Sequence, residues 1–451
     1  MIKPIVLAGG LLSITVSLPK TELPPFPSIE SATKLNWKAS VGLASFRTNV
    51  LFSGDRLYIG SNGDQFMDRG LIESTSGVYV LNRKTGKQVL HFGNEMFGDM
   101  DVNGLLAYQD RLYFGNDNEE FLCTDPSGKI IWRNPTSGDI EHEPVLIKTK
   151  NAQQVVYATE TGEVKAVDPA TGKIMWSYYI PGFDGWRPGD NRTVFKIKAW
   201  FTSTSYFYTK PVVTDLNNDG WEDLIYRSFS GGLIALNGAN GNSLWTTGEG
   251  ETVDIGFSLV GKGKDRKIVS LVDVYSYADN TQRSDIVFFS LSGKKIKTIS
   301  LPEKDWGTGL NTLRLENGSI LANGCRKTYI IHADGEYEII DRSTPYTYED
   351  WNKTLQEGYR NGRESLFANR PFRLSNGKTG VIVMNQHDPA SSSGGFLEIL
   401  CLEDRSVVAR LSLPSGSEMP PIIDDVDRDG DLDILIGTYN NNLYCYQLPT
   451  F

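Results

Sequence analysis

The sequence is poor in cysteine and histidine, the residues that most often build disulfide frameworks and transition-metal sites. It has 4 of each among its 451 residues, and no His–carboxylate spacing indicates a metal centre of that kind. Cys123, Cys401 and Cys445 fall at what looks like one position of a repeated unit, where other copies carry Val, Ala, Ser or Ile. Because a position that accepts such residues is a small buried slot, we expect packed free thiols there and no disulfides.

Positive charge is also scarce, since 45 Lys and Arg face 55 Asp and Glu and leave a formal net charge of −10. A nucleic-acid partner needs a basic face for its phosphates, so this balance argues against one. The nucleophilic-serine elbow, the P-loop and the dinucleotide fingerprint are absent as well. Local motifs therefore assign no catalytic residue and no organic cofactor.

The apolar run near the start of the chain is shorter than a transmembrane helix requires. Residues 1–31 combine one lysine, this apolar run and a Pro-rich polar linker, which resembles a secretory signal or an N-terminal anchor. No cleavage motif follows the run, so cleavage and retention both stay open. We expect an exported protein, in the periplasm, at the cell surface or secreted, with no membrane span beyond this segment.

What the chain has in abundance is one strand-and-turn unit. VKAVDPATG, ending at Gly172, and LIALNGANG, ending at Gly241, are two copies, and each is followed by a strand with a tryptophan. Successive copies lie roughly 40–50 residues apart, the period of a four-stranded propeller blade, and some steps carry insertions. One third-strand position per copy gives Val80, Cys123, Ala166, Ala235, Ser290, Ile331, Cys401 and Cys445. The repeat predicts an all-β, eight-bladed β-propeller of four-stranded antiparallel blades over residues 32–451, with seven blades as the fallback.

The two ends of the chain indicate how the ring closes. A fourth strand with Trp132, Trp176 or Trp245 follows the turn in three copies, but the last copy stops at Phe451 without one. The ordered part of the chain instead begins with a similar strand, around Trp37. We expect this N-terminal strand to complete the last blade and to remove the exposed edges of an open array.

Two acidic loops share the pattern D-x-[DN]-x-D-G-x-x-D. Alternate side chains would place several oxygens around one point, the glycine permits the turn, and the residue after it offers a backbone carbonyl. Such hard oxygen ligands suit Ca²⁺, so we predict two calcium sites that act as structural staples. The candidate ligands are Asp215, Asn217, Asp219, Trp221 and Asp223 in one loop and Asp425, Asp427, Asp429, Asp431 and Asp433 in the other. The alternative is a pair of solvated turns rich in Asn and Asp.

These segments resemble two repeat families. The acidic loops, followed by Leu224-Ile225 and Ile434-Leu435, look like FG-GAP repeats, the calcium-binding blades of integrin α-chain propellers. AVDPATGKIMW and ALNGANGNSLW are similar to the pyrroloquinoline-quinone-type repeat, A-x-D-x-x-T-G-x-x-x-W, whose tryptophan docks one blade on the next. That repeat builds the eight-bladed quinoprotein dehydrogenases and the scaffold propellers of outer-membrane assembly lipoproteins.

The resemblance is specific for the fold and leaves the function open. A quinoprotein dehydrogenase would need a central pocket with a Trp floor, a calcium-binding Glu/Asn/Asp set and an Asp base, and it typically carries an adjacent Cys-Cys pair. No such pair exists here, and no position matches the pocket set. We expect a non-catalytic binding or scaffold module for a protein or glycan partner at the cell envelope. The alternatives are a quinoprotein-like or carbohydrate-active enzyme that uses the channel mouth, and a structural plug or adaptor in a larger envelope assembly.

Two long insertions are the places where a partner would bind. Residues 178–207 and 343–369 each connect the fourth strand of one blade to the first strand of the next, and long loops on a rigid scaffold often carry function. Aromatic and arginine side chains are favoured as interface anchors. The candidates are Trp186, Arg187, Arg192, Trp200, Trp351, Tyr359 and Arg360. The alternative is that the two insertions cover one another and the channel mouth.

A ring of mixed charge is expected just before the first strands. Its members are Arg47, Glu143, Lys210, Arg370 and Glu418. Such a ring could hold a polar or zwitterionic ligand, or it could form a hydrated rim of salt bridges, and the second interpretation is favoured.

Overall fold

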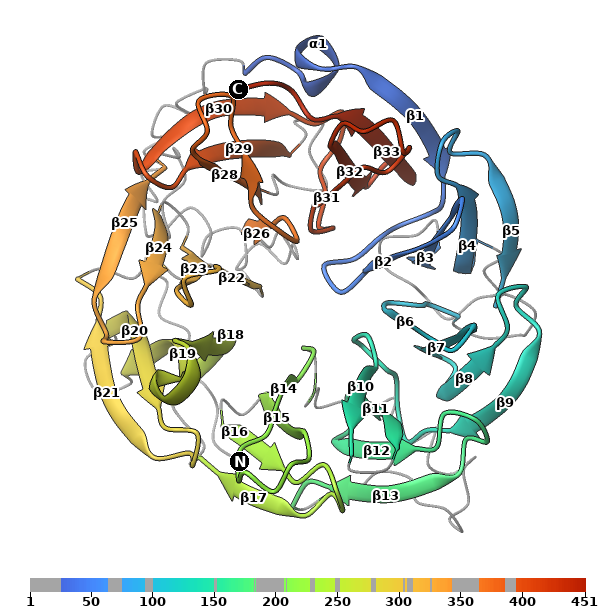
Figure 1. Ribbon diagram of the computed structural model, residues 1–451, viewed down its shortest axis with the longest axis vertical. Helices are drawn as coiled ribbons and strands as arrows, with labels where there is room; N and C mark the ends of the chain where they lie inside the picture. Colours follow the sequence, from blue (N-terminus) through green and yellow to red (C-terminus); the bar gives the residue numbers. More distant parts are fainter. Residues whose placement is uncertain are drawn as a thin grey trace, which may run out of the picture.

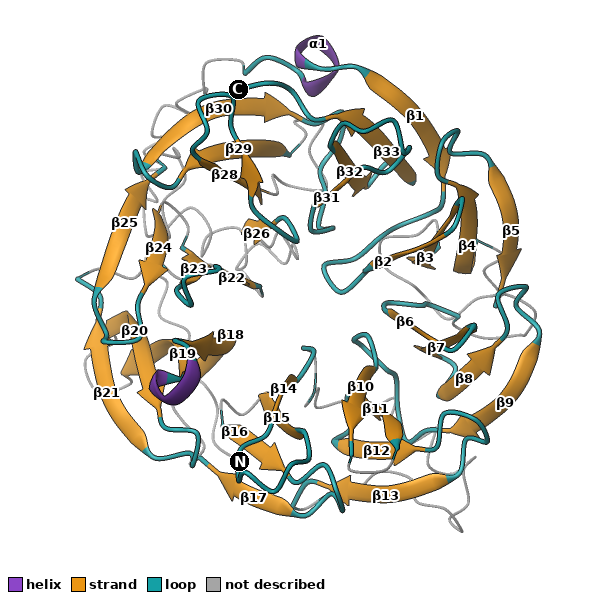
Figure 2. Cartoon of the chain, viewed as in Figure 1, coloured by secondary structure: helices purple, strands orange, loops and turns teal. Residues whose placement is uncertain are grey.

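The chain forms eight antiparallel sheets arranged as blades around a central axis (Figure 1). The structure is a computed structural model, and it describes residues 26–63, 75–93, 100–149, 152–181, 183, 207, 209–227, 232–247, 252–276, 281–302, 305, 311–324, 327–342, 365–385 and 395–451. Nearly all of the regular structure in these ranges is strand, and helix is confined there to the single turns α1 (Ile29–Ala32) and η1 (Gly263–Asp265) (Figure 2). No helix in these ranges is long and apolar enough to cross a membrane.

Each of the first four blades is one antiparallel meander. The first is β2 (Val50–Ser53), β3 (Arg56–Asn62), β4 (Ser76–Asn82) and β5 (Gln88–Phe92), and the second is β6 (Leu105–Tyr108), β7 (Arg111–Asn116), β8 (Glu120–Thr124) and β9 (Ile130–Pro135). The third is β10 (Val145–Lys148), β11 (Gln153–Ala158), β12 (Glu163–Val167) and β13 (Ile174–Tyr179), and the fourth is β14 (Val212–Thr214), β15 (Asp223–Arg227), β16 (Leu233–Leu236) and β17 (Ser243–Thr246).

The remaining four blades repeat this order with two variations. The fifth is β18 (Thr252–Val260), β19 (Lys267–Ser276), β20 (Thr281–Phe289) and β21 (Lys295–Ser300), and the sixth is β22 (Thr312–Arg314), β23 (Ile320–Asn323), β24 (Lys327–Ile331) and β25 (Tyr337–Asp341). In the seventh, β26 (Ser365–Phe367) and β27 (Phe372–Arg373) share the innermost edge of β28 (Thr379–Asn385), which is followed by β29 (Phe396–Cys401) and β30 (Ser406–Ser412). The eighth is β31 (Ile422–Asp424), β32 (Asp433–Thr438), β33 (Asn442–Gln447) and β1 (Leu35–Ser40).

The N-terminal strand closes the ring as the sequence predicted. β1 pairs antiparallel with β33, and Trp37 lies opposite Cys445 (Figure 1). Eight closed blades confirm the predicted fold and remove the seven-bladed alternative. Ahead of β1, Ile29 is fully buried in the core of the seventh blade, and Ser28 forms a parallel bridge with Ser412 on β30.

The blades are joined by cores that lie between neighbouring sheets. At the closure, one apolar cluster combines Leu435 and Cys445 of the eighth blade with Ile59 and Leu81 of the first. Because each sheet buries both faces, its inner strands are buried over most of their length, whereas the outermost strands are partly exposed. β12, for example, is buried at every residue, while β9 follows an alternating pattern. The exposed apolar side chains therefore gather on the outer strands.

A tryptophan on the outer strand of one blade docks on the next blade at four joints. In each case the indole Nε1 donates a hydrogen bond to a backbone carbonyl of the neighbouring turn. The pairs are Trp37 with Arg83 at 2.7 Å, Trp132 with Pro169 at 3.2 Å, Trp176 with Gly238 at 3.0 Å and Trp245 with Leu291 at 3.0 Å. The same turns contain Gly86, Gly172, Gly241 and Gly293, all at positive φ, and a Cβ on any of them would lie within 2.6 Å of an indole carbon. Glycine is required because both the backbone conformation and the space exclude a side chain.

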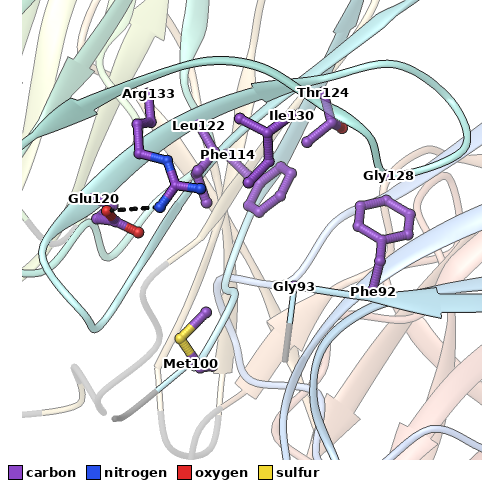
Figure 3. A pocket seen from close by; sticks show the side chains of 10 residues that line it. All are labelled: Phe92, Gly93, Met100, Phe114, Glu120, Leu122, Thr124, Gly128, Ile130 and Arg133. Carbon is purple, nitrogen blue, oxygen red and sulfur yellow. Dashed lines mark hydrogen bonds and ion pairs between the residues drawn. The ribbon is translucent and has the colours of Figure 1, made fainter. Parts of the chain in front are cut away.

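The joint between the first and second blades uses a phenylalanine instead. Phe92 packs on Gly128, and a small cavity of about 50 Å³ remains beside it, lined among others by Met100 and Phe114 (Figure 3). At the mouth of this cavity, Arg133 pairs with Glu120 at 3.4 Å (Figure 3). The smaller ring thus leaves part of this joint unfilled.

The strand bulges correct one sequence-based expectation. Cys123 and Cys445 both lie opposite a tryptophan, next to the bulge between the third and fourth strands. In the seventh blade the residue at that place is Ile399, and Cys401 lies two residues further on, opposite Ser406. The prediction that the three cysteines share one position is therefore wrong for Cys401. The anchor residue Ser290 is displaced in the same way, because the bulge of the fifth blade directly follows Phe288. In the sixth blade β24 pairs with β25 without a register shift, and Ile331 lies opposite Tyr337. The three thiols are nevertheless free and buried, because a shift of two residues keeps the same face of a strand.

The docking turn gives a first testable prediction. Gly241→Ala should lower the free energy of unfolding by about 2–4 kcal/mol, because the new Cβ meets the Trp176 ring and φ is +73°. Gly377→Ala is the matched control, since its φ is +81° but nothing lies within 4 Å of the added atom. The control should cost about 1–2 kcal/mol, the backbone contribution alone. Urea unfolding followed by tryptophan fluorescence measures both, and equal losses would contradict the docking role of the glycine.

Candidate functional site

The two acidic loops occupy equivalent places in opposite blades. One connects β14 to β15 in the fourth blade, and the other connects β31 to β32 in the eighth, across the ring (Figure 1). Asn218 and Arg428 have φ of +60° and +63°, and Gly220 and Gly430 are also at positive φ. The shared backbone shape confirms that both loops are copies of one turn at one blade position.

The loop of the eighth blade brings three carboxylates together. Among the described residues, Asp425, Asp427 and Asp433 form the one group of three whose ligand atoms all lie within 4.8 Å of one another. Asp433 begins β32, where its Oδ2 accepts hydrogen bonds from the backbone N–H of Val426 at 2.8 Å and of Asp427 at 3.3 Å. Its Oδ1 accepts a bond from Asn36 Nδ2 at 2.9 Å. Strand and loop backbone thus hold this carboxylate at the centre of the turn.

The electrostatics of this cluster favour a cation. Burial, together with the neighbouring charges of Asp427 and Asp429, raises the pKa of Asp433 to about 6, although two backbone hydrogen bonds oppose the shift. Burial and the charges of Asp429 and Asp425 also raise the pKa of Asp427. The Oδ1 atom of Asp425 is buried and has no hydrogen-bond donor. An unpartnered oxygen beside two mutually repelling carboxylates fits the hard oxygen ligands of Ca²⁺.

The loop of the fourth blade has the same shape but a different charge arrangement. Asp215 accepts backbone bonds from Asn218 at 2.7 Å and Gly220 at 3.1 Å, one to each oxygen. Asp219 accepts from the Trp221 N–H at 2.8 Å and from the side-chain amides of Asn217 and Asn237 at 2.9 and 3.1 Å. Because Asn217 stands where the other loop has Asp427, amide donors here replace one carboxylate. Burial still raises the pKa of Asp223.

The loop of the eighth blade is tied directly to the ring closure. Arg83, in the turn that receives the Trp37 indole, is buried and donates from Nε to the Val426 carbonyl at 2.9 Å and from Nη2 to the Asp425 carbonyl at 2.8 Å. Its guanidinium also stacks on Phe52, 4.4 Å from the ring centre. One arginine therefore joins the first blade, the docked N-terminal strand and the acidic loop.

The expected rim of mixed charge consists of ion pairs where the structure describes it. Arg47 pairs with Glu141, and Lys210 pairs with Glu143. Arg370 donates to the Ile423 carbonyl at 3.0 Å, and its Nη2 lies 4.0 Å from Asp424. These contacts agree with the salt-bridge interpretation that the sequence favoured.

Asparagine clamps between the innermost strands were missed from the sequence. In each, the side-chain amide exchanges two hydrogen bonds with one residue of the next blade. The pairs are Asn49 with Leu105, Asn311 with Phe367 and Asn369 with Ile423. The recurrence of asparagine just ahead of an inner strand was the available signal.

The candidate partner residues lie outside the described part of the chain. These are Trp186, Arg187, Arg192, Trp200, Trp351, Tyr359 and Arg360. Both insertions fall between the expected elements, β13 and β14 in one case and β25 and β26 in the other. Their predicted bounds were too wide, because residues 178–179 belong to β13 and residues 365–367 form β26.

Fold, blade closure and tryptophan docking together define an eight-bladed propeller of the pyrroloquinoline-quinone-like repeat type. Residues 74–184, which cover parts of the first three blades, match the family model described as outer membrane protein assembly factor BamB. No curated protein matches the sequence.

Solved propellers share this architecture at low sequence identity. BamB from Moraxella catarrhalis is 12% identical, with a TM-score of 0.52 over 91% of this chain and 98% of that one. A quinohemoprotein alcohol dehydrogenase, ADHIIG from Pseudomonas putida HK5, is 11% identical, with a TM-score of 0.52 over 92% of this chain and 76% of that one. The Dos1 propeller is 10% identical, with a TM-score of 0.56 over 92% and 95%. Likeness at this level concerns the fold alone.

A buried histidine beside the rim predicts a pH dependence. Burial lowers the pKa of His142 to about 4, aided by the charges of Lys210 and Arg47 and opposed by the Glu143 carbonyl, which accepts from Nδ1–H at 2.8 Å. The unfolded value is about 6.5, so the unfolded chain takes up a proton first as the pH falls. Stability is therefore complete above pH 6.5 and is lost as the pH falls toward 4, by about 2 kcal/mol between pH 7 and 5.

The variant His142→Gln isolates this contribution. Other titrating groups change the stability of the parent and the variant alike. The variant should therefore lose less free energy of unfolding than the parent between pH 7 and pH 5, because it lacks the contribution of His142. If the parent and the variant lose the same free energy of unfolding over this range, His142 is not the titrating group.

Proposed function

We propose that this protein is a non-catalytic, calcium-stabilised propeller that binds a protein partner in the cell envelope. The observation that carries the proposal is the match of residues 74–184 to the BamB family, whose name refers to assembly of outer membrane proteins. A scaffold at that location must be exported, which agrees with the signal-like composition of residues 1–31. A glycan is the less supported partner, since no comparison points to one.

Calcium would have a structural task in this protein. Asp425, Asp427 and Asp433 would hold the ion, and the backbone carbonyl after Gly430 would add an oxygen. Bound there, it would neutralise three clustered carboxylates next to the two carbonyls that Arg83 contacts. The ion would therefore stabilise the joint at which the ring closes. The FG-GAP-like loop of the fourth blade is the second proposed site, and we expect it to bind more weakly because Asn217 replaces a carboxylate.

The insertions at 178–207 and 343–369 are the proposed partner surface. Both leave an outer strand and return to an inner one, so in a propeller both emerge on the same side of the ring. A rigid ring of eight blades can hold two such loops in a fixed relation, which suits the recognition of a protein surface.

The effect of calcium on the free energy of unfolding tests whether the protein binds the ion. Adding calcium after EDTA treatment should raise the free energy of unfolding by about 2.7 kcal/mol when free calcium is 100 times the dissociation constant. Asp427→Asn should abolish most of this gain, since it removes one of three clustered carboxylates. Thermal unfolding with and without calcium measures both effects.

Two further variants control this experiment. Asp110→Asn makes the same charge change at an exposed turn with φ of +54°, and it should leave the calcium response intact. Asn217→Asp gives the fourth-blade loop the acidic pattern of the other and should increase the response. An unchanged melting temperature in EDTA and in calcium, for the parent and every variant, would contradict a structural metal.

Partner binding is tested by cross-linking in the native host, followed by affinity purification from the separated envelope and cytosol. The parent should recover a defined envelope protein, and a variant with residues 184–206 replaced by a short connection should lose it while keeping the parental melting temperature. Recovery of the protein in the cytosol alone would contradict the envelope proposal. Equal recovery of the partner by both forms would contradict the proposed surface.

The second candidate function is that of a quinone-dependent dehydrogenase, which the eight-bladed fold shared with ADHIIG allows. It predicts dye reduction by the calcium-loaded protein after addition of pyrroloquinoline quinone and an alcohol. The scaffold proposal predicts no turnover above that of a heat-denatured sample.

A further inference from the structure

A groove of about 820 Å³ lies between the sixth and seventh blades and reaches the eighth. Three turns line it, namely the turn after β22 that carries Leu315, the turn after β24 that carries His332, and the turn after β29 that carries Leu402. Leu432, which directly precedes β32 of the eighth blade, also lines the groove. The volume falls within the range of about 300–1,000 Å³ that is typical of sites for small organic ligands.

Two of the groove's carboxylates are already engaged by the protein. Glu338 accepts a bond from His332 Nε2 at 2.9 Å and pairs with Arg405. Glu403 accepts from the Thr379 N–H at 2.9 Å and from its hydroxyl at 2.8 Å. Burial alone would raise the pKa of Glu403, but these bonds and the charge of Arg373 lower it. Both carboxylates are therefore already held by hydrogen bonds from protein groups.

Two arginines of the seventh blade that line the groove keep free donors. Arg373 is exposed and donates from Nη1 to the Gly377 carbonyl at 3.0 Å, and within the described residues no carboxylate lies at ion-pair distance from it. Arg370 donates from Nε to the Ile423 carbonyl, and its Nη2 reaches Asp424 only at 4.0 Å. Since carbonyl bonds fix both guanidinium groups, their remaining N–H donors are positioned before any ligand arrives.

The charged side chains that line the groove favour a ligand with one negative charge. The groove contains four arginines and three glutamates, namely Arg314, Arg370, Arg373, Arg405, Glu316, Glu338 and Glu403. The lining residues alone thus carry one more positive than negative charge, which favours an anion over a cation, although Asp424 lies 4.0 Å from Arg370 and offsets part of this excess. The three glutamates would repel a dianion such as phosphate more strongly than a monoanion. Leu315, Ile330, Phe372 and Leu402 supply apolar wall beside the arginines.

We infer that this groove binds a monocarboxylate attached to an apolar body, with Arg370 and Arg373 holding the carboxylate and Phe372 and Leu402 contacting the apolar part. A planar carboxylate can accept two parallel N–H bonds from one guanidinium, which fixes its orientation. The inference goes beyond the proposed scaffold function and depends neither on the envelope partner nor on the insertions.

The test is isothermal titration calorimetry with 4-phenylbutyrate in calcium-containing buffer. The parent should bind it saturably, and Arg373→Gln and Arg370→Gln should each weaken binding about tenfold, the usual cost of one charge-assisted hydrogen bond. Both side chains are exposed, so the variants should keep the parental circular dichroism and melting temperature. Arg56→Gln is the matched control, because it removes an exposed arginine outside the groove and should bind as the parent does.

The neutral amide and inorganic phosphate complete the design. 4-Phenylbutanamide keeps the apolar body without the charge and should bind at least tenfold more weakly, and phosphate should not compete. Absence of saturable heat with 4-phenylbutyrate would overturn the inference, as would equal binding by the parent and both groove variants, or equal binding of acid and amide.

A competition experiment with peptides distinguishes two sources of the carboxylate, a free organic acid and the C-terminus of a polypeptide. Gly-Gly-Gly-Phe with a free C-terminus competes with 4-phenylbutyrate if the groove takes the end of a polypeptide, and the C-terminally amidated peptide does not. If neither peptide competes while 4-phenylbutyrate binds, the ligand is a free organic acid. Either result with arginine dependence supports the site.

Discussion

The fold depends on the contact between an outer-strand tryptophan and a glycine turn in the next blade. Each indole gives one hydrogen bond to a carbonyl and lays its ring on a residue that can carry no side chain. A blade cannot bury both faces alone, so the ring becomes stable when every blade is packed against its two neighbours. Four of the eight joints use the indole, and the closing joint at Trp37 is one of them, although its strand comes from the other end of the chain.

Arg83 makes the closing joint different from the others. Its carbonyl receives the Trp37 indole, and its guanidinium reaches the acidic loop of the eighth blade, 343 positions further along the chain. The cost of clustering Asp425, Asp427 and Asp433 is thus coupled to the joint that the N-terminal strand must complete. The fourth-blade loop packs Leu216 against the fifth blade, and on its other side Glu222 and Lys148 of the third blade exchange backbone and side-chain bonds. A cation would stabilise this ordinary joint less than the closing one.

The repeated blade motif could be predicted from the sequence, whereas the contacts between residues of different blades could not. Trp176 and Gly241 recur at blade spacing, so the period, the blade number and the closing strand could all be inferred from spacing alone. The bulge that displaces Cys401 leaves no mark in the sequence, because any residue can occupy it. The contact of Arg83 with Asp425 and the clamp from Asn369 join separate blades, and a single sequence does not record such pairs. The burial of His142, near the ion pairs of Arg47 with Glu141 and of Lys210 with Glu143, likewise depends on contacts between separate blades.

The central claim is that the closing joint is the place where the acidic loop, the N-terminal strand and the first blade stabilise one another. Hydrogen exchange measured by mass spectrometry in calcium and in EDTA tests it most directly. The account predicts that removal of calcium speeds exchange in β1, β33 and the turn around Arg83, while peptides of β11 and β12 in the third blade keep their protection. Equal exchange in both conditions at the closing joint, or an equal change in all blades, would contradict it.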